Sequence, residues 1–465
     1  MSGPLFSASW YRVAGLTPRL RAHAQIHRHE YRGQLWYVLE DRSSTRFHRF
    51  SPPAYLVIGL MDGHRTVQEI WDTAMRRLGD EAPTQDEMIQ LLGQLHRADV
   101  LQSDVPPDTA EMLGRRERQE RRRWQGQLLS FLSWRVPLLD PERLLQRFLW
   151  LVRPLVGWFG ALVWLAVVGA GAVLAATHWG DLSRDVVDRV MAPQSLLLLW
   201  LAFPAVKALH ELGHAFVTKA WGGEVHDMGV MFLVFTPVPY VDASAASAFR
   251  SKWRRILVGA AGMLVELFVA ALALGLWLSV QPGAVRTLAY NVVFIAGAST
   301  LLFNANPLLR FDGYYILADL IEIPNLRARA NAYLGYLTER YLFGREDADA
   351  GPATAGERLW FVGYAIASFA YRVLIVAGIV LFIAAKFLLL GVLVAASTAV
   401  AWVGIPLVRA VAYLLTSARL RRVRWRAVTV SATLVALAVG LVGYVPLPLR
   451  TRTEGVVWIP DEAIV

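Results

Sequence analysis

An H-E-x-x-H motif, His210-Glu-Leu-Gly-His214, lies inside an apolar stretch of the chain. On a helix, residues four apart lie on the same face, so the imidazoles of His210 and His214 can bind one metal ion. Glu211 then lies beside that ion, where its carboxylate can act as a general base on water. The motif arises by chance in such a chain with a probability of about 1%. The pattern predicts a zinc site; a buried Lys, Glu and His cluster that lines a transport path is the alternative.

A catalytic zinc ion needs a third protein ligand and an open position. Because the chain contains no Cys, that ligand has to be His, Asp or Glu. Glu224 is too close to the motif and follows two glycines, where a helix is not expected. A later apolar stretch ends in Asn304-Ala-Asn-Pro-Leu-Leu-Arg-Phe-Asp-Gly313, where Pro307 interrupts the helix and Gly313 allows a tight turn. Irregular backbone at membrane depth is tolerated only beside protein or a water-filled cavity, so this break marks a site.

Other polar residues near these motifs are weaker candidates. The Gly- and Pro-broken segment 222–255 is expected to form a re-entrant flap beside the site. It could supply extra polar contacts from His226, Asp227 and Asp242. Glu266 stands alone in an apolar stretch, and either a functional role or a hydrogen bond between packed helices would explain it.

The composition indicates an integral membrane protein. The 465 residues are 55% hydrophobic and 18% charged, whereas soluble domains are about 25% charged. The absence of Cys excludes a disulfide scaffold, an iron–sulfur centre and a thiol nucleophile. Seven apolar stretches are long enough to span a bilayer: 155–177, 193–216, 256–281, 287–309, 359–385, 387–408 and 427–446. Arg372 in the fifth stretch would cost about 2.5–3.5 kcal/mol unless it faces protein or water, so six spans are the alternative.

Basic residues predict the orientation of these spans, because positive charge collects in cytoplasmic loops. With seven spans, the basic clusters all fall on one side of the membrane: 115–123, 252–255, 327–340 and 419–426. The N-terminus is then cytoplasmic and the C-terminus periplasmic. Since topology accounts for the net charge of +10, no nucleic acid partner is expected. The run 115–123 is expected to face anionic lipid.

The region before the first span has the pattern of a small winged-helix α+β domain. Residues 34–40 and 45–50 alternate like two strands of a hairpin. Helical spacing follows at 53–60, 66–78 and 84–98. Thr66 and Thr84 are expected to cap the last two helices in capping boxes with Glu69 and Glu87.

The chain therefore divides into an N-terminal tail (1–23), the winged-helix domain (24–104), a basic juxtamembrane linker (105–150), a transmembrane domain (151–446) and the start of an extracytoplasmic β segment (447–465). The expected fold class is mainly α, a polytopic helical membrane protein of about seven spans.

H-E-x-x-H on one span with N-x-x-P-x-x-x-x-D-G on a later span resembles the site-2 protease family of intramembrane zinc metalloproteases. The resemblance covers residues 193–320. It implies that His210, His214 and Asp312 hold Zn²⁺, that Glu211 is the catalytic base and that Asn304 lines the site. Arg310 departs from the family, because it stands in a stretch that is often apolar and Pro-rich; this bears on substrate preference more than on metal binding.

Two further regions resemble known modules. Residues 24–104 resemble the PqqD-like domain, or RiPP recognition element, which binds leader peptides, through the hairpin and the segments 52–63, 66–70 and 91–95. A winged helix used for docking or regulation is the alternative. The tail from Arg450 to Pro460 resembles the first strand of a haemolysin D-type adaptor domain.

Together these features predict a zinc metalloendopeptidase in a bacterial inner membrane. Its partners are expected to be a peptide or membrane-protein substrate, the lipid bilayer and components of an export system. One alternative is a non-proteolytic membrane component of a peptide or small-molecule export system, although a scaffold would need the ligands and not Glu211. The last alternative, a DNA-binding winged helix released by proteolysis, is disfavoured because no helix there concentrates Arg on one face.

Overall fold

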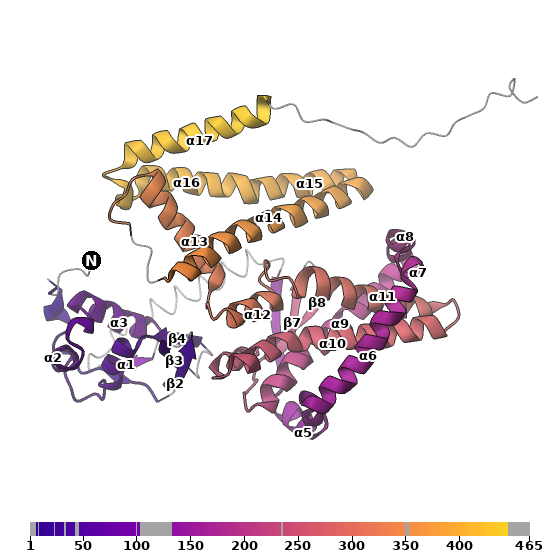
Figure 1. The fold of residues 1–465 in the computed structure, drawn as a ribbon, viewed down its shortest axis with the longest axis horizontal. Coiled ribbons are helices and arrows are strands. Elements are labelled where there is room, and N and C mark those ends of the chain that lie inside the picture. Colours follow the sequence, from indigo (N-terminus) through magenta and orange to yellow (C-terminus); the bar gives the residue numbers. More distant parts are fainter. Residues whose placement is uncertain are drawn as a thin grey trace, which may run out of the picture. The chain divides into compact units, whose positions relative to one another are not determined.

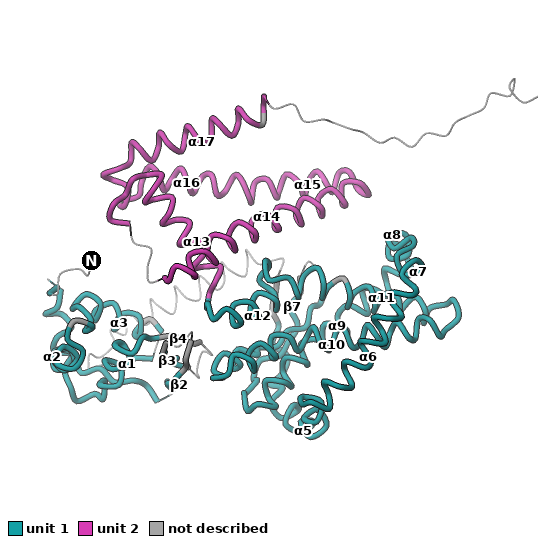
Figure 2. The backbone as a smooth tube through the Cα atoms, viewed as in Figure 1, with its two compact units in different colours: residues 1–324 teal, residues 325–465 magenta. Residues whose placement is uncertain are grey.

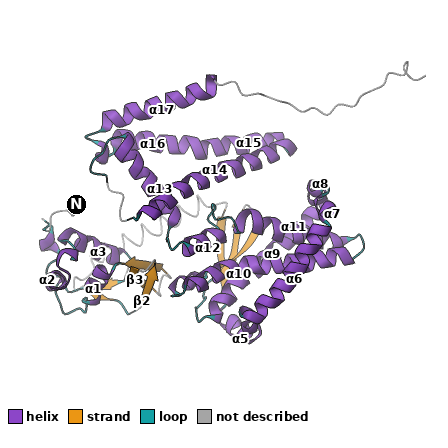
Figure 3. Ribbon diagram, in the orientation of Figure 1, coloured by secondary structure: helices purple, strands orange, loops and turns teal. Residues whose placement is uncertain are grey.

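The computed structural model describes residues 6–7, 9–22, 24–31, 34–41, 46–98, 100–102, 133–233, 236–348 and 353–444. The predicted basic run 115–123 and the predicted β segment 447–465 lie outside these residues. The chain forms two compact units, Met1–Pro324 and Asn325–Val465 (Figure 2). Figure 3 shows that helices dominate both units.

The N-terminal part of the first unit is a small α/β region. Its antiparallel sheet has the order β2-β3-β4, and its helices follow directly. The elements are β2 (Ala24–Tyr31), β3 (Gln34–Asp41), β4 (Arg46–Phe50), α1 (Pro52–Gly59), α2 (Val67–Leu78) and α3 (Gln85–Arg97). The predicted hairpin and three helices are confirmed, while β2 was not predicted.

Local sequence explains the helix starts in this region, and distant residues complete its core. Both predicted capping boxes are confirmed, at Thr66 with Glu69 and at Thr84 with Glu87. The core includes Leu39, Ile58, Ile70, Met88 and Leu95.

The segment before residue 24, predicted to be a tail, also packs on this core. Trp10, in the short helix η1 (Trp10–Arg12), is buried, and its ring centroid lies 5.5 Å from that of Trp71. The two-residue strand β1 (Arg19–Leu20) pairs with β5 (Leu101–Gln102). These contacts join the first described residues to the end of the same α/β region.

Long apolar helices make up most of the rest of the first unit (Figure 1). They are α6 (Trp158–Thr177), α9 (Pro193–Ala220), α10 (Lys252–Ser279) and α11 (Ala284–Ala298), which continues as a π-helical turn, η5 (Ser299–Asn304). Helices α9, α10 and α11 pack on one another, and α6 packs on α10. Small residues permit close contact, because a Cβ on Gly171 would lie 2.5 Å from the Cβ of Ala271. Ser195 and Asn291 add buried hydrogen bonds between α9 and α11.

Two strands of a three-stranded sheet lie in the segment predicted as a flap. Strands β7 (Met228–Leu233) and β8 (Thr236–Val241) form a hairpin, and β6 (Ser133–Leu139) pairs with β7. Strand β6 and helix α5 (Glu142–Val152) come from the range predicted as a linker. The hairpin therefore pairs with a strand that precedes the first long helix in the sequence.

Strand β8 has two prolines on its outer edge. Val241 turns its N–H away from β7 and donates it to Glu211 Oε2. Because successive residues of an antiparallel strand face its neighbour and then away from it, Pro237 and Pro239 also face away from β7. Their missing N–H groups therefore remove no hydrogen bond from the sheet.

The second unit contains α13 (Leu326–Leu337), α14 (Ala355–Lys386), α15 (Leu388–Ala399), α16 (Ile405–Thr416) and α17 (Arg424–Tyr444). Helices α15 and α16 join through a π-helical turn, η7 (Val400–Gly404), into one long segment. With the four helices of the first unit, seven helices in the described part of the chain are long and apolar enough to cross a membrane. This confirms the predicted number of spans by length and composition.

Arg372 in α14 does not contradict this assignment. Its Nε donates to the carbonyl of Ser368 at 3.0 Å, and its guanidinium lies 6.0 Å from the ring centroid of Trp402. The charged side chain therefore has protein partners inside an apolar segment, as the sequence required.

Candidate metal centre

His210 and His214 lie one turn apart on α9, as their spacing predicts. Both are buried, their Nε2 atoms are 3.1 Å apart, and their rings meet edge to face with centroids 4.8 Å apart. Two ring nitrogens therefore face the same point.

A neighbouring backbone group decides which nitrogen of His214 carries the proton. Nδ1 of His214 lies 2.6 Å from the carbonyl oxygen of Val258 in α10. Since a carbonyl only accepts hydrogen bonds, Nδ1 must be the donor. In the neutral ring, Nε2 then has the free lone pair that a metal ion requires.

Asp312 brings a carboxylate to the same point. It is the first residue of α12 (Asp312–Leu320), and its Oδ2 lies 3.1 Å from Nε2 of His210 and 3.5 Å from Nε2 of His214. Burial alone would raise the pKa of Asp312, but its contacts with the two imidazoles hold the pKa well below its usual range. One ligand atom from each of the three residues lies within 4.8 Å of the others.

The atoms of this group fit a cation. Asp312 Oδ2 is buried and has no hydrogen-bond partner among the described residues. An orphaned carboxylate oxygen facing two ring nitrogens is costly unless a cation or proton binds between them. The carboxylates of Glu211 and Glu266 lie close to the same group, and a divalent ion bound there would offset acidic charge that the ammonium of Lys207 alone does not balance.

Two ion pairs hold the helix that carries Asp312. Arg255 of α10, which is buried, contacts Asp319 of α12 with Nε to Oδ1 at 2.6 Å. Lys252 contacts Glu322, just after α12, at 3.0 Å. These pairs join α12 to the beginning of α10.

Gly313 lets α12 start beside the break in the preceding segment. A Cβ there would lie 2.5 Å from the carbonyl oxygen of Ala305. The sequence suggested that Gly313 supplies a tight turn, but its φ is not among the positive values. Gly313 is thus needed for close approach of two backbones.

Glu211 lies next to the ligand group and is held from another element. Its Oε2 accepts a hydrogen bond from the N–H of Val241, the last residue of β8, at 3.1 Å. The hairpin therefore orients the carboxylate that the motif indicates as a base.

Asn304 lies behind His210 and outside the three-residue ligand group. Its Nδ2 donates to Oε2 of Glu266 at 3.2 Å, and both residues are buried. Glu266, left open between two roles by the sequence, contacts Nδ1 of His210 at 3.1 Å. A lone acid in an apolar stretch was the signal in the sequence.

The weaker candidates lie apart from the ligand group. His226 pairs with Asp140 at 3.1 Å, and this hydrogen bond raises the pKa of His226. Asp227 accepts from the hydroxyl of Tyr240. Asp242 accepts from a backbone N–H two residues on. Each of these side chains has a local structural partner.

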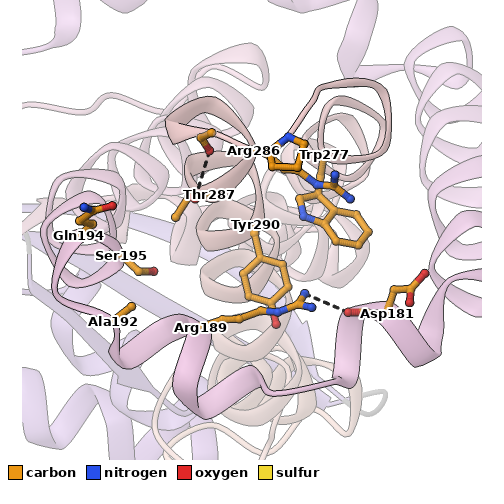
Figure 4. A pocket seen from close by; sticks show the side chains of 11 residues that line it. Asp181, Arg189, Ala192, Gln194, Ser195, Trp277, Arg286, Thr287 and Tyr290 are labelled. Carbon is orange, nitrogen blue, oxygen red and sulfur yellow. Dashed lines mark hydrogen bonds between the residues drawn. The ribbon is translucent and has the colours of Figure 1, made fainter.

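A cavity of about 550 Å³ lies at the opposite end of α9 (Figure 4). Its lining includes Arg189 over the ring of Tyr290 and Arg286 over the ring of Trp277. It adjoins the N-terminal ends of α9 and α11. The first residue of α9 lies about 25 Å from His210 along the axis of α9. This cavity is separate from the candidate metal centre.

No protein-family model, curated protein or solved structure matches this chain.

Proposed function

We propose that this protein is a zinc-dependent endopeptidase of the site-2 protease type. One observation carries the proposal: His210, His214 and Asp312 direct three ligand atoms to one buried point beside Glu211. Two His and one carboxylate are a common donor set of catalytic zinc sites.

Each residue then has one role. His210, His214 and Asp312 hold the ion. Bound zinc supplies Lewis acidity, which polarises a peptide carbonyl and makes water acidic near neutral pH. Glu211 takes the proton of the attacking water and returns it to the leaving amine. Because Oε2 accepts the N–H of Val241, Oε1 is the oxygen that we assign to this transfer.

The wider organisation supports a peptide substrate delivered at a membrane. Seven helices of suitable length support a multi-pass protein, which we place in a bacterial inner membrane with a cytoplasmic N-terminus and a periplasmic C-terminus. The N-terminal α/β region supports a winged-helix domain of the PqqD-like type that docks the peptide.

The test uses the full chain in bilayer nanodiscs. Zinc content is measured by elemental analysis, and cleavage of a library of apolar peptides is followed by mass spectrometry. Wild type should bind one zinc ion and cleave peptides. Glu211→Gln should keep the ion and lose cleavage, whereas Asp312→Ala should lose both. Equal cleavage by wild type and Glu211→Gln would refute the proposed reaction.

A further inference from the structure

Glu266 is the most completely enclosed ionisable side chain near the metal centre. It lies in the middle of α10 and is 1% exposed. Oε1 lies 2.6 Å from Nζ of Lys207 and 3.1 Å from Nδ1 of His210. Oε2 accepts hydrogen bonds from the hydroxyl of Thr300 and from Nδ2 of Asn304.

Lys207 compensates the charge of this carboxylate. An ionised acid inside an apolar helix bundle is costly unless it is paired and hydrogen-bonded. Lys207, one turn before His210 on α9, supplies the opposite charge and also donates to Oγ of Ser299 at 2.6 Å. The network therefore links α9, α10 and η5 at the level of the first histidine.

The two histidines are oriented by different kinds of group. His214 is held by a backbone carbonyl, that of Val258, which substitution cannot remove. His210 has the Glu266 carboxylate beside Nδ1, while its Nε2 lies 3.1 Å from Asp312. A carboxylate beside one ring nitrogen favours a proton there, which leaves Nε2 for the metal and makes it a better ligand.

We propose that Glu266 is the positioning residue of His210 in the metal centre, and that Lys207 holds the Glu266 carboxylate in place. Thr300 and Asn304 orient the carboxylate from the other side, so Asn304 acts through Glu266. This inference rests on the proposed metal site and is independent of peptide hydrolysis.

The test measures metal binding by the full chain in nanodiscs. Zn²⁺ affinity is obtained by competition with a chelating dye, and the visible absorption spectrum of the Co²⁺ form reports the ligand geometry. Glu266→Gln keeps the shape of the side chain and removes its charge. We expect Zn²⁺ affinity to fall about 10- to 100-fold and the Co²⁺ bands to shift.

A second variant distinguishes an effect on the position of His210 from a loss of stability. It is needed because Glu266→Gln leaves Lys207 buried without its counter-charge, which by itself destabilises the fold. The double variant Lys207→Met/Glu266→Gln removes both charges. It should fold more stably than Glu266→Gln alone, yet its Zn²⁺ affinity should stay low. Recovery of wild-type affinity in the double variant would overturn the proposal.

Asn291→Leu is the matched control. It removes a buried hydrogen bond between α9 and α11 outside the metal centre. Thermal stability should fall while Zn²⁺ affinity stays within about twofold of wild type. An equal loss of affinity in Asn291→Leu would show a general packing effect and would overturn the proposal.

The proposed function and this inference can fail separately. If wild type binds Zn²⁺ and loses it on substitution of Glu266 but cleaves no peptide, the inference stands and the peptidase fails. If Glu266→Gln binds Zn²⁺ like wild type with an unchanged Co²⁺ spectrum, the inference fails whatever the activity. Absence of Zn²⁺ binding by wild type overturns both.

Discussion

Gly262 lies directly against the imidazole of His210. A Cβ at this position of α10 would be 2.5 Å from Nε2 and Cε1 of the ring. The ring therefore occupies the space that the side chain of any other residue would fill, and the position of the His210 imidazole depends on the absence of a side chain at Gly262. The sequence shows Gly259-Ala-Ala-Gly262 only as a run of small residues suited to helix packing.

Gly262→Ala should displace the His210 ring and weaken metal binding. We expect a loss of Zn²⁺ affinity of at least tenfold, since a ligand nitrogen must stay close to its ideal distance from the ion. Gly275→Ala, on the same helix with no atom within 4 Å of the added Cβ, is the control and should keep wild-type affinity. Chelator competition measures both variants, and equal affinities would contradict the prediction.

Asp319→Asn should loosen the helix that carries Asp312. The substitution leaves Arg255 buried with a weaker partner, and breaking a buried pair typically costs about 3–5 kcal/mol. Lys252→Met removes the more exposed pair with Glu322 and should cost about 0–1 kcal/mol. Thermal unfolding with Zn²⁺ titration should show the larger loss for Asp319→Asn. The prediction fails if the two variants behave alike.

Removing the metal should destabilise the protein, because the carboxylates of the centre then lack their counter-charge. Zn²⁺ at about 100 times its dissociation constant should add about 2.7 kcal/mol to the free energy of unfolding. Asp312→Ala should show little of this stabilisation. Unfolding with added Zn²⁺ or with a chelator measures the difference, and an equal Zn²⁺ shift in wild type and variant would argue against Asp312 as a ligand.

The contact of His226 with Asp140 should make the β6–β7 junction sensitive to pH. The hydrogen bond from His226 to Asp140 raises the pKa of His226 above 6.5. A group whose pKa is higher in the folded protein than in the unfolded chain stabilises the fold fully at pH values below its unfolded-state pKa. This contribution is lost as the pH rises through the folded-state pKa. The contact should therefore weaken from about pH 6.5 upward.

Histidine-labelled NMR titration tests this sign. In Asp140→Asn the pKa of His226 should fall toward its ordinary value. Because the side chain is exposed, the effect on global stability should be small. A His226 pKa that Asp140→Asn does not change would show that the pair has no electrostatic role.

Local patterns in the sequence predicted most of the elements. The alternation at 34–50, the capping boxes at Thr66 and Thr84 and the seven apolar stretches involve residues close together in the chain, and the structure contains each of them. The pairing of β6 with β7 was missed, because Val136 meets Val230 only through the fold. Trp10 was assigned to a tail for the same reason, since its contact with Trp71 is not local.

The sequence by itself determined the chemistry available at the centre. Two histidines one helical turn apart, a glutamate beside the first and no Cys predict a metal site built from His and carboxylate ligands, because helical periodicity is local. The tertiary structure determined where each acidic residue lies relative to the two histidines. Packing of α9, α10 and α12 brings Asp312 to the ligand group, places Glu266 behind His210, and leaves Glu224 and Asp242 outside it. These choices depend on contacts between residues far apart in the chain, which no local pattern records.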